Sequence, residues 1–193
     1  MRNDPVSPVV LAAALSACAL EPGLLNSERI GERFGSYGIE ILDHESGVRR
    51  SSLYSIENDR RVCRTYAVVE FLDQASRDVV GAHEEVLAGN SIGATFKATG
   101  WQIRKETLHV GSMPLRDSRH AIAALMHLDE SAILSTHAYR LILEKNSRSV
   151  HYATIIETHH PEYLTESELH QLYDLDPDSK LEPQELRALT DLA

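Results

Sequence analysis

Apolar and polar residues alternate with a period of two through much of the middle of the chain. This alternation is typical of strands that bury one face. Asn58-Asp59 and Asn146-Ser147 each separate two such segments, where tight turns favour these residue types. The pattern predicts strands over residues 37–41, 48–57, 61–72, 101–110, 133–143 and 150–158.

Helical periodicity appears between the predicted strands. The segment 76–87 places apolar residues and His83 on one stripe and is followed by Gly89, a residue that favours helix ends. Further helices are predicted over 26–34 and from Asp117 or Ser118 onward. Because short turns join runs of strands, we expect an α+β core domain over residues 26–160, with a mainly antiparallel sheet and helices packed on one face.

Composition narrows the possible classes of protein. The chain has 193 residues, of which 42% are hydrophobic and 25% charged, which is typical of a globular protein. Its net charge of −10 disfavours a nucleic-acid partner, because phosphates repel an acidic protein. With two cysteines, the chain has no disulfide framework.

The segment after His159-His160-Pro161 predicts a helix, a loop and a second helix over residues 161–193. Thr165 and Glu168 form a capping box, which starts a helix at about Thr165. Pro183 suits the first turn of the second helix. The loop between them carries regularly spaced oxygen ligands at positions 1, 3, 5, 7, 9 and 12, namely Asp174, Asp176, Asp178, the carbonyl of Lys180, Glu182 and Glu185.

This loop resembles an EF-hand, and the resemblance implies calcium as the bound ion. The sixth position is Ser179 where the motif has glycine, and strain there predicts weak affinity, about 10⁻⁴ to 10⁻³ M. An acidic, solvated turn is the alternative interpretation. EF-hands usually pair, so a single copy is expected to form a homodimer, to bind a protein partner or to pack on the preceding domain.

An apolar run near the N-terminus ends in Leu15-Ser-Ala-Cys18. It is too short to span a bilayer but suits a signal segment. It resembles the lipobox of bacterial lipoprotein precursors, which implies a signal segment over residues 1–18 and lipidation of Cys18. Ala19 then implies an outer-membrane lipoprotein of the cell envelope that faces the periplasm. A hydrophobic first helix packed on the core is the alternative.

Three features have the pattern of catalytic sites. Gly89-Asn-Ser91-Ile-Gly93 matches the G-x-S-x-G elbow of serine hydrolases, although the segment before it is predicted to be helical. His83-Glu84 lacks the second histidine of a zinc protease motif, so His83 is predicted to be a hydrogen-bonded core residue. Cys63 has arginines nearby, but the apolar residues of its strand predict burial.

Arginines on adjacent predicted strands form a candidate anion site. Arg49, Arg50, Arg61 and Arg64, with Tyr66, could converge on an anionic ligand. Cross-strand pairing with Glu57, Asp59 or Glu70 is the favoured alternative. His151, His159 and His160 could bind a soft metal, and exposure to solvent is the alternative for the adjacent pair.

Together these features predict a lipid-anchored bacterial envelope protein with one calcium-binding loop and a structural or partner-binding role. A serine hydrolase that uses Ser91 and a small anionic-ligand binding module built on the arginine-rich strands are the alternatives. Whether the protein is an enzyme stays open, and a binding role is favoured.

Overall fold

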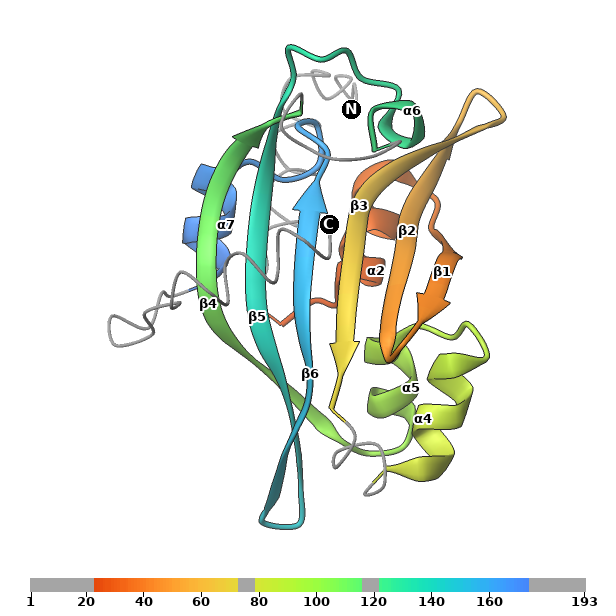
Figure 1. The fold of residues 1–193 in the computed structure, drawn as a ribbon, viewed down its shortest axis with the longest axis vertical. Coiled ribbons are helices and arrows are strands. Elements are labelled where there is room, and N and C mark those ends of the chain that lie inside the picture. Colours follow the sequence, from red (N-terminus) through yellow and green to blue (C-terminus); the bar gives the residue numbers. More distant parts are fainter. Residues whose placement is uncertain (1–22, 73–78, 116–121, 174–193) are drawn as a thin grey trace, which may run out of the picture.

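The protein, seen in a computed structural model, is described over residues 23–72, 79–115 and 122–173. Its six strands form one antiparallel sheet in the order β1-β2-β3-β6-β5-β4 (Figure 1). The strands are β1 (Gly38–Glu45), β2 (Val48–Glu57), β3 (Arg60–Phe71), β4 (Gln102–Pro114), β5 (Ile133–Lys145) and β6 (Arg148–His159). The helices of the described ranges are α2 (Asn26–Phe34), α4 (Val80–Leu87), α5 (Ile92–Ala98), α6 (Ile122–Met126) and α7 (Glu166–Leu172). The predicted α+β class with an antiparallel sheet is confirmed.

The sheet consists of two three-stranded halves that meet at its centre. Strands β1, β2 and β3 lie side by side, as do β4, β5 and β6, and β3 pairs with β6 between them. In that central pairing Thr65 lies opposite His159 and Phe71 lies opposite Ala153. Residues that are about 90 positions apart in the sequence therefore become direct neighbours.

The turns between β2 and β3 and between β5 and β6 lie where the sequence predicts them. Asn58 and Asp59 have φ of 48° and 62°, and Asn146 and Ser147 have φ of 50° and 61°. Two consecutive residues with positive φ are typical of the type I′ turn, whose twist matches that of paired strands. These short polar side chains tolerate that conformation, so the turns fix the register of both hairpins.

The two faces of the sheet contact different helices. Ala67 belongs to an apolar cluster with side chains of α2 and α7, and Val69 to one with side chains of α4 and α5, so these helices lie on one side, here called the helical face. Val68, which points the other way, packs with Ile122 and Met126 of α6. The prediction that helices pack on one face therefore holds for α2, α4, α5 and α7 and is wrong for α6.

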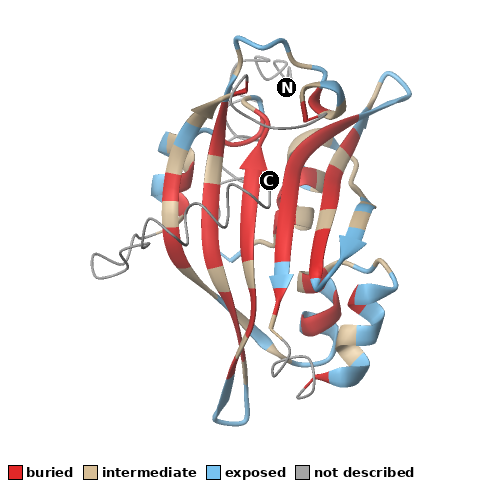
Figure 2. Ribbon diagram, viewed as in Figure 1, coloured by how far each residue is buried: buried red, intermediate tan, exposed pale blue. Residues whose placement is uncertain are grey.

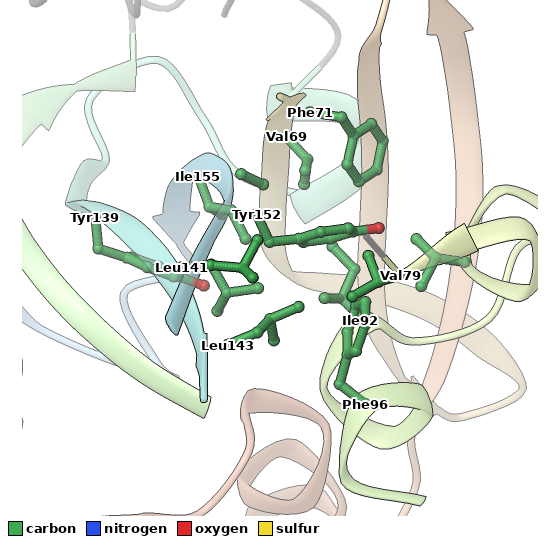
Figure 3. Close-up of a cluster of buried hydrophobic side chains, with 13 residues drawn as sticks. Val69, Phe71, Val79, Ile92, Phe96, Tyr139, Leu141, Leu143, Tyr152 and Ile155 are labelled. Atoms are coloured by element: carbon green, nitrogen blue, oxygen red, sulfur yellow. The ribbon is translucent and has the colours of Figure 1, made fainter. Parts of the chain in front are cut away.

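An aromatic cluster joins the helical face to α5. The ring of Tyr152 lies edge-on to Phe71 and Phe96, with centroids 5.6 Å and 4.7 Å away. Figure 3 shows Tyr152 between the strand residues Leu141 and Ile155 and the helix residues Ile92 and Phe96. This packing holds α5 against the lower half of the sheet.

Helix α5 was not predicted, because Gly93 and Thr95 make its sequence a poor helix former. Ile92 and Phe96 are one turn apart and buried, so tertiary packing stabilises the helix. Figure 2 shows β2, β3, β5 and β6 buried over most of their length, and the hairpin tips exposed. Within the described ranges, none of the helices has the combined length and apolar character needed to cross a bilayer.

Helix α7 begins where the capping box predicts. The hydroxyl of Thr165 accepts from the Glu168 amide at 3.3 Å, and the Glu168 carboxylate accepts from the Thr165 amide at 2.7 Å. Leu169 and Leu172 are buried in a cluster with Leu53 of β2. The residues from 161 to 173 therefore pack on the sheet, whereas the rest of the predicted helix-loop-helix lies outside the described residues.

Substitution Thr165→Ala should destabilise the protein by about 1 kcal/mol, because it removes the hydroxyl that satisfies a free helix amide. Chemical denaturation measures the free energy of unfolding. The control Thr165→Ser keeps the hydroxyl and should stay near the native value. Equal stability of both variants and the native protein would show that the cap is not needed.

Candidate functional site

A cavity of about 80 Å³ lies between the helical face and the N-terminal ends of α2 and α5. One water needs about 10–15 Å³ on this measure, so the space suits several waters or a small organic molecule. We call it the inner cavity. Its walls are mainly apolar with a few charged groups, and are formed by Leu25, Asn26, Ser27, Ile39, Arg49, Ser51, Leu53, Ala67, Val69, Ser91, Ile92, Gly93, Ile103, Lys105, Tyr139, Leu141, Ile155 and Glu157.

The inner cavity exists because small residues occur where the sheet and helices face each other. Ser51 and Ala67 lie opposite each other on β2 and β3, and both line the floor. Gly93 allows α5 to approach the start of α2, because a Cβ atom there would lie 2.7 Å from Cδ2 of Leu25. Contact between Gly93 and Leu25 therefore closes the cavity where α2 and α5 meet.

Arg49 provides a buried positive charge at the β2 end of the inner cavity. Its side chain is 3% exposed, and its Nη1 donates to the carbonyl oxygens of Val86 at 2.9 Å and Asn90 at 3.4 Å. Within the described residues, no carboxylate forms an ion pair with Arg49, and its Nε has no hydrogen-bond partner. Burial lowers the pKa of Arg49, although an arginine stays charged at neutral pH.

A second buried polar group near Arg49 also lacks a partner. The Ser51 Oγ is fully buried without a hydrogen bond. Burial raises the pKa of the Tyr37 hydroxyl, and a hydrogen bond with Ser91, a residue of the cavity lining, partly offsets this rise. Buried polar groups in proteins are nearly always satisfied, by protein atoms, by water or by a ligand. The unpaired groups here, Nε of Arg49 and Oγ of Ser51, therefore need a hydrogen-bond acceptor. The positive charge of the guanidinium favours an acceptor that is an anion.

Lys105 of β4 and Glu157 of β6 form a largely buried ion pair on the side of the inner cavity opposite Arg49. Lys105 Nζ lies 3.5 Å from Glu157 Oε2, and the two side chains are 18% and 7% exposed. Burial alone would raise the pKa of Glu157, but Lys105, His159 and hydrogen bonds from Asn26 and Tyr139 hold it below its usual value. Glu157 is therefore ionised and can accept a hydrogen bond from a ligand.

A hydrogen-bonded network holds Glu157 in place. Asn26 Nδ2 donates to Glu157 Oε1 at 3.1 Å and to Thr65 Oγ1 at 3.2 Å. The Tyr163 hydroxyl donates to the Asn26 side chain, and Thr65 Oγ1 lies 2.9 Å from Nδ1 of His159. These partners lie on α2, β3 and β6, and in the segment between β6 and α7. Several elements of the fold therefore hold the Glu157 carboxylate in position.

The inner cavity thus has two polar ends with an apolar middle. Arg49 at one end suits a carboxylate or similar anion, and ionised Glu157 at the other suits a hydroxyl or amine donor. Side chains such as Val69, Leu141 and Ile155 line the space between them. This arrangement suits a compact organic acid with an apolar body.

The structure separates the arginines that the sequence grouped. Arg50 pairs with Asp43 at 2.8 Å and Arg61 with Glu40 at 3.1 Å, so both form ion pairs with acidic residues of β1 instead of the predicted Glu57, Asp59 or Glu70. Arg64 is buried among Glu57, Glu162 and Ser55. Tyr66 packs with Val68 on the face opposite the helical face. Of the predicted arginine group, Arg49 is the member that lines the cavity.

Ser91 lines the inner cavity, but its surroundings are not those of a hydrolase elbow. The elbow requires a strand before the serine, whereas Ser91 follows α4 and directly precedes α5. No histidine belongs to the described lining of the cavity. Ser91 is therefore placed to contact a ligand rather than to act as an activated nucleophile.

The hydrogen bond predicted for His83 and the burial predicted for Cys63 are confirmed, although His83 itself is only partly buried. His83 bonds through Nδ1 to the Tyr152 hydroxyl at 2.7 Å. Cys63 is 1% exposed, and burial raises the pKa of its thiol to about 11, which disfavours a reactive thiolate.

The structure describes the three histidines of the predicted soft-metal site but not the residues of the predicted calcium site. His159 and His160 are 1% and 4% exposed, so the expectation that they are solvent-exposed is wrong. They contact Thr65 and Arg64, and the described part of the chain holds no group of three potential metal ligands. The lipidation site Cys18 and the calcium ligands Asp174, Asp176, Asp178, Lys180, Glu182 and Glu185 lie outside the described residues.

Sequence inspection missed Lys105, Glu157 and Asn26 as site residues. Glu157 offers the clearest signal, because it is a lone carboxylate in the otherwise apolar and neutral run from Tyr152 to Thr158. Charged residues are rarely buried unless they are paired. Its partner Lys105 lies on another strand, and only the β4-β5-β6 pairing brings the two together.

Protein stability should fall as the pH drops from 6.5 to 4, because burial holds the pKa of His159 at about 4 against an ordinary 6.5. The unfolded chain takes up the proton first, which removes about 3 kcal/mol by pH 4. In His159→Gln, the slope of unfolding free energy against pH between 5 and 6 should decrease by about 1 kcal/mol per pH unit. Ser149→Ala, at an exposed position of the same strand, leaves His159 and its contacts in place and should retain the native slope. An unchanged slope in His159→Gln would contradict the assignment.

Comparison of the sequence with models of known protein families and with curated proteins gives no match. The inner cavity is the main candidate for a binding site in the described part of the chain, with a buried arginine and a buried carboxylate at the two ends of a mainly apolar space.

Proposed function

We propose that the protein binds a small organic acid in the inner cavity. The ligand has a carboxylate that contacts Arg49, a compact apolar body of about the size of one ring, and preferably a hydroxyl group directed at Glu157. The observation that carries this proposal is the Arg49 guanidinium, which is 3% exposed and has no carboxylate partner within the described residues.

Energetics supports an anionic ligand at this end. Placing a charged group in the protein interior costs several kcal/mol unless an opposite charge or hydrogen bonds compensate. Carbonyl oxygens of Val86 and Asn90 satisfy Nη1 of Arg49, and Nε stays without a partner. A ligand carboxylate would supply both the missing acceptor and the missing charge.

Direct binding of simple probes tests this proposal. Isothermal titration calorimetry should show that benzoate binds, that uncharged benzyl alcohol binds more weakly, and that 4-hydroxybenzoate binds more tightly because Glu157 accepts from its hydroxyl. Arg49→Met should weaken benzoate binding about 10- to 100-fold, because a charge-assisted hydrogen bond contributes about 1.5–3 kcal/mol.

The matched control is Arg61→Met, which removes an exposed arginine from β3 and should leave benzoate affinity unchanged. Equal affinity of native protein and Arg49→Met for benzoate, or equal affinity of native protein for benzoate and benzyl alcohol, would contradict the role of Arg49. Absence of binding by all three probes would contradict the proposed ligand class.

A second candidate function is acid–base catalysis on the bound acid. It rests on Glu157, which lines the inner cavity, is 7% exposed and is joined to Lys105 and Asn26. An ionised carboxylate that faces a bound substrate can accept a proton from it. Loss of turnover but not of binding in Glu157→Gln would distinguish catalysis from simple binding.

We also retain the calcium-binding loop and the lipid anchor as proposals. The spacing of Asp174 to Glu185 supports calcium, and the α7 capping box provides the entering helix that the loop requires. The oxygen donors of this loop suit a hard cation. The lipobox at Cys18 supports an outer-membrane lipoprotein of the cell envelope, and a lone loop would pair in a homodimer or with a partner.

Calcium should raise the melting temperature of the full chain, because an ion that binds only the folded loop stabilises it by about 2.7 kcal/mol at one hundred times its dissociation constant. Differential scanning calorimetry with calcium or with a chelator measures this shift. Glu185→Ala, which removes the last ligand, should abolish it, whereas the neighbouring Gln184→Ala should not. Identical melting with calcium and with chelator would rule out the site.

A further inference from the structure

An outer groove adjoins the inner cavity. Its volume is about 620 Å³, much larger than that of the inner cavity. Leu25, Ile103 and Lys105 line both spaces, so these three residues form the boundary between them. The full lining of the groove is Gly23, Leu24, Leu25, Arg29, Lys97, Trp101, Gln102, Ile103, Arg104, Lys105, Leu172 and Tyr173.

The described lining of the outer groove is rich in cations. Its described lining contains four cations, Arg29, Lys97, Arg104 and Lys105, and no carboxylate, although the chain carries a net charge of −10. Acidic partners such as Glu28, 2.8 Å from Lys97, and Glu144, 2.9 Å from Arg104, lie outside the lining. A third carboxylate, Glu106, lies 4.0 Å from Arg104, so the groove is lined by cations whose acidic partners lie around it.

Lys105 connects the two spaces. Its Nζ lies 3.5 Å from Glu157, a residue of the inner cavity, and donates at 3.3 Å to the hydroxyl of Tyr173, a residue of the outer groove. Leu25 lies at the same boundary, next to Gly93 of α5. A charged side chain and an apolar side chain thus meet where the two spaces adjoin.

We propose that the outer groove is the entry route of the anionic ligand, and that Lys97 and Arg104 accelerate its association by electrostatic attraction. This inference rests on the proposed binding of an organic acid. The side chains of Lys97 and Arg104 are 61% and 52% exposed, so they act in solvent and affect the approach of the ligand more than its final contacts. Such steering raises association rates and is weakened by salt.

Exchange of 4-fluorobenzoate, followed by ¹⁹F NMR on the full chain, measures both rate constants. In the double variant Lys97→Gln/Arg104→Gln the association rate constant should fall about three- to tenfold at low ionic strength. The dissociation rate constant should stay within about twofold, and the difference in association should vanish near 1 M salt, where the screening length is about 3 Å. Arg60→Gln/Arg61→Gln, which removes two charges from the β2–β3 end of the sheet, is the matched control.

Trp101, the single tryptophan of the chain, lines the groove and provides a test without any ligand. Iodide should quench its fluorescence more efficiently than caesium, and the Lys97→Gln/Arg104→Gln variant should lose much of that difference. Acrylamide, which is neutral, should quench native protein and variant equally. Because the full chain is used, quenching by the two ions reports the net electrostatic potential at Trp101. Lys145, whose Nζ lies over the Trp101 ring, contributes to that potential.

The possible outcomes separate the two proposals. Native protein that binds 4-fluorobenzoate, with an association rate constant that neither the variant nor salt changes, would overturn the entry route and leave ligand binding intact. Iodide quenching no stronger than caesium quenching would overturn the positive groove directly. Native protein that does not bind 4-fluorobenzoate would contradict the proposed function itself.

Discussion

Pairing of β3 with β6 is the interaction on which the candidate site depends. It joins the two halves of the sheet and sets Thr65 against His159 and Ala67 against Glu157. Through it, the arginine of β2 and the carboxylate of β6 come to face one space beneath α2 and α5. A shift of this pairing by one residue would turn Glu157 to the opposite face and would eliminate the polar end of the inner cavity.

The second constraint is the free-energy cost of placing charged groups in the protein interior. Arg49, Lys105 and Glu157 are all at least largely buried, and a charged group is stable inside a protein only when its surroundings compensate it. Lys105 and Glu157 compensate each other, with Asn26 and Tyr173 as further partners. Two carbonyl oxygens and the Phe71 ring surround the Arg49 guanidinium, and none of these carries a net charge, so the described residues leave a net positive charge at that end. The two ends of the cavity therefore differ chemically. One end suits an anion, and the other suits a group that donates a hydrogen bond.

Local sequence was sufficient for most of the fold. The strand alternation, the Asn58-Asp59 and Asn146-Ser147 turns and the Thr165 capping box each depend on residues close together in the chain, and all were predicted correctly. Helix α5 was missed because its stability comes from burying Ile92 and Phe96, which is a tertiary effect. The position of α6 on the other face was missed for the same reason, since Ile122 and Met126 pack on residues of β3 and β5.

The sequence by itself determined the α+β class, the antiparallel hairpins and the acidic and lipobox-like segments, because periodicity, turn chemistry and ligand spacing are local properties. It also identified Arg49 as one of several candidate anion-binding residues. Only the tertiary structure decided that Arg49 faces a cavity while Arg50, Arg61 and Arg64 pair elsewhere, and that Lys105 and Glu157 complete the site. The physical reason is that the direction and neighbours of a side chain depend on strand register and on bulges, which are set by pairing between distant segments.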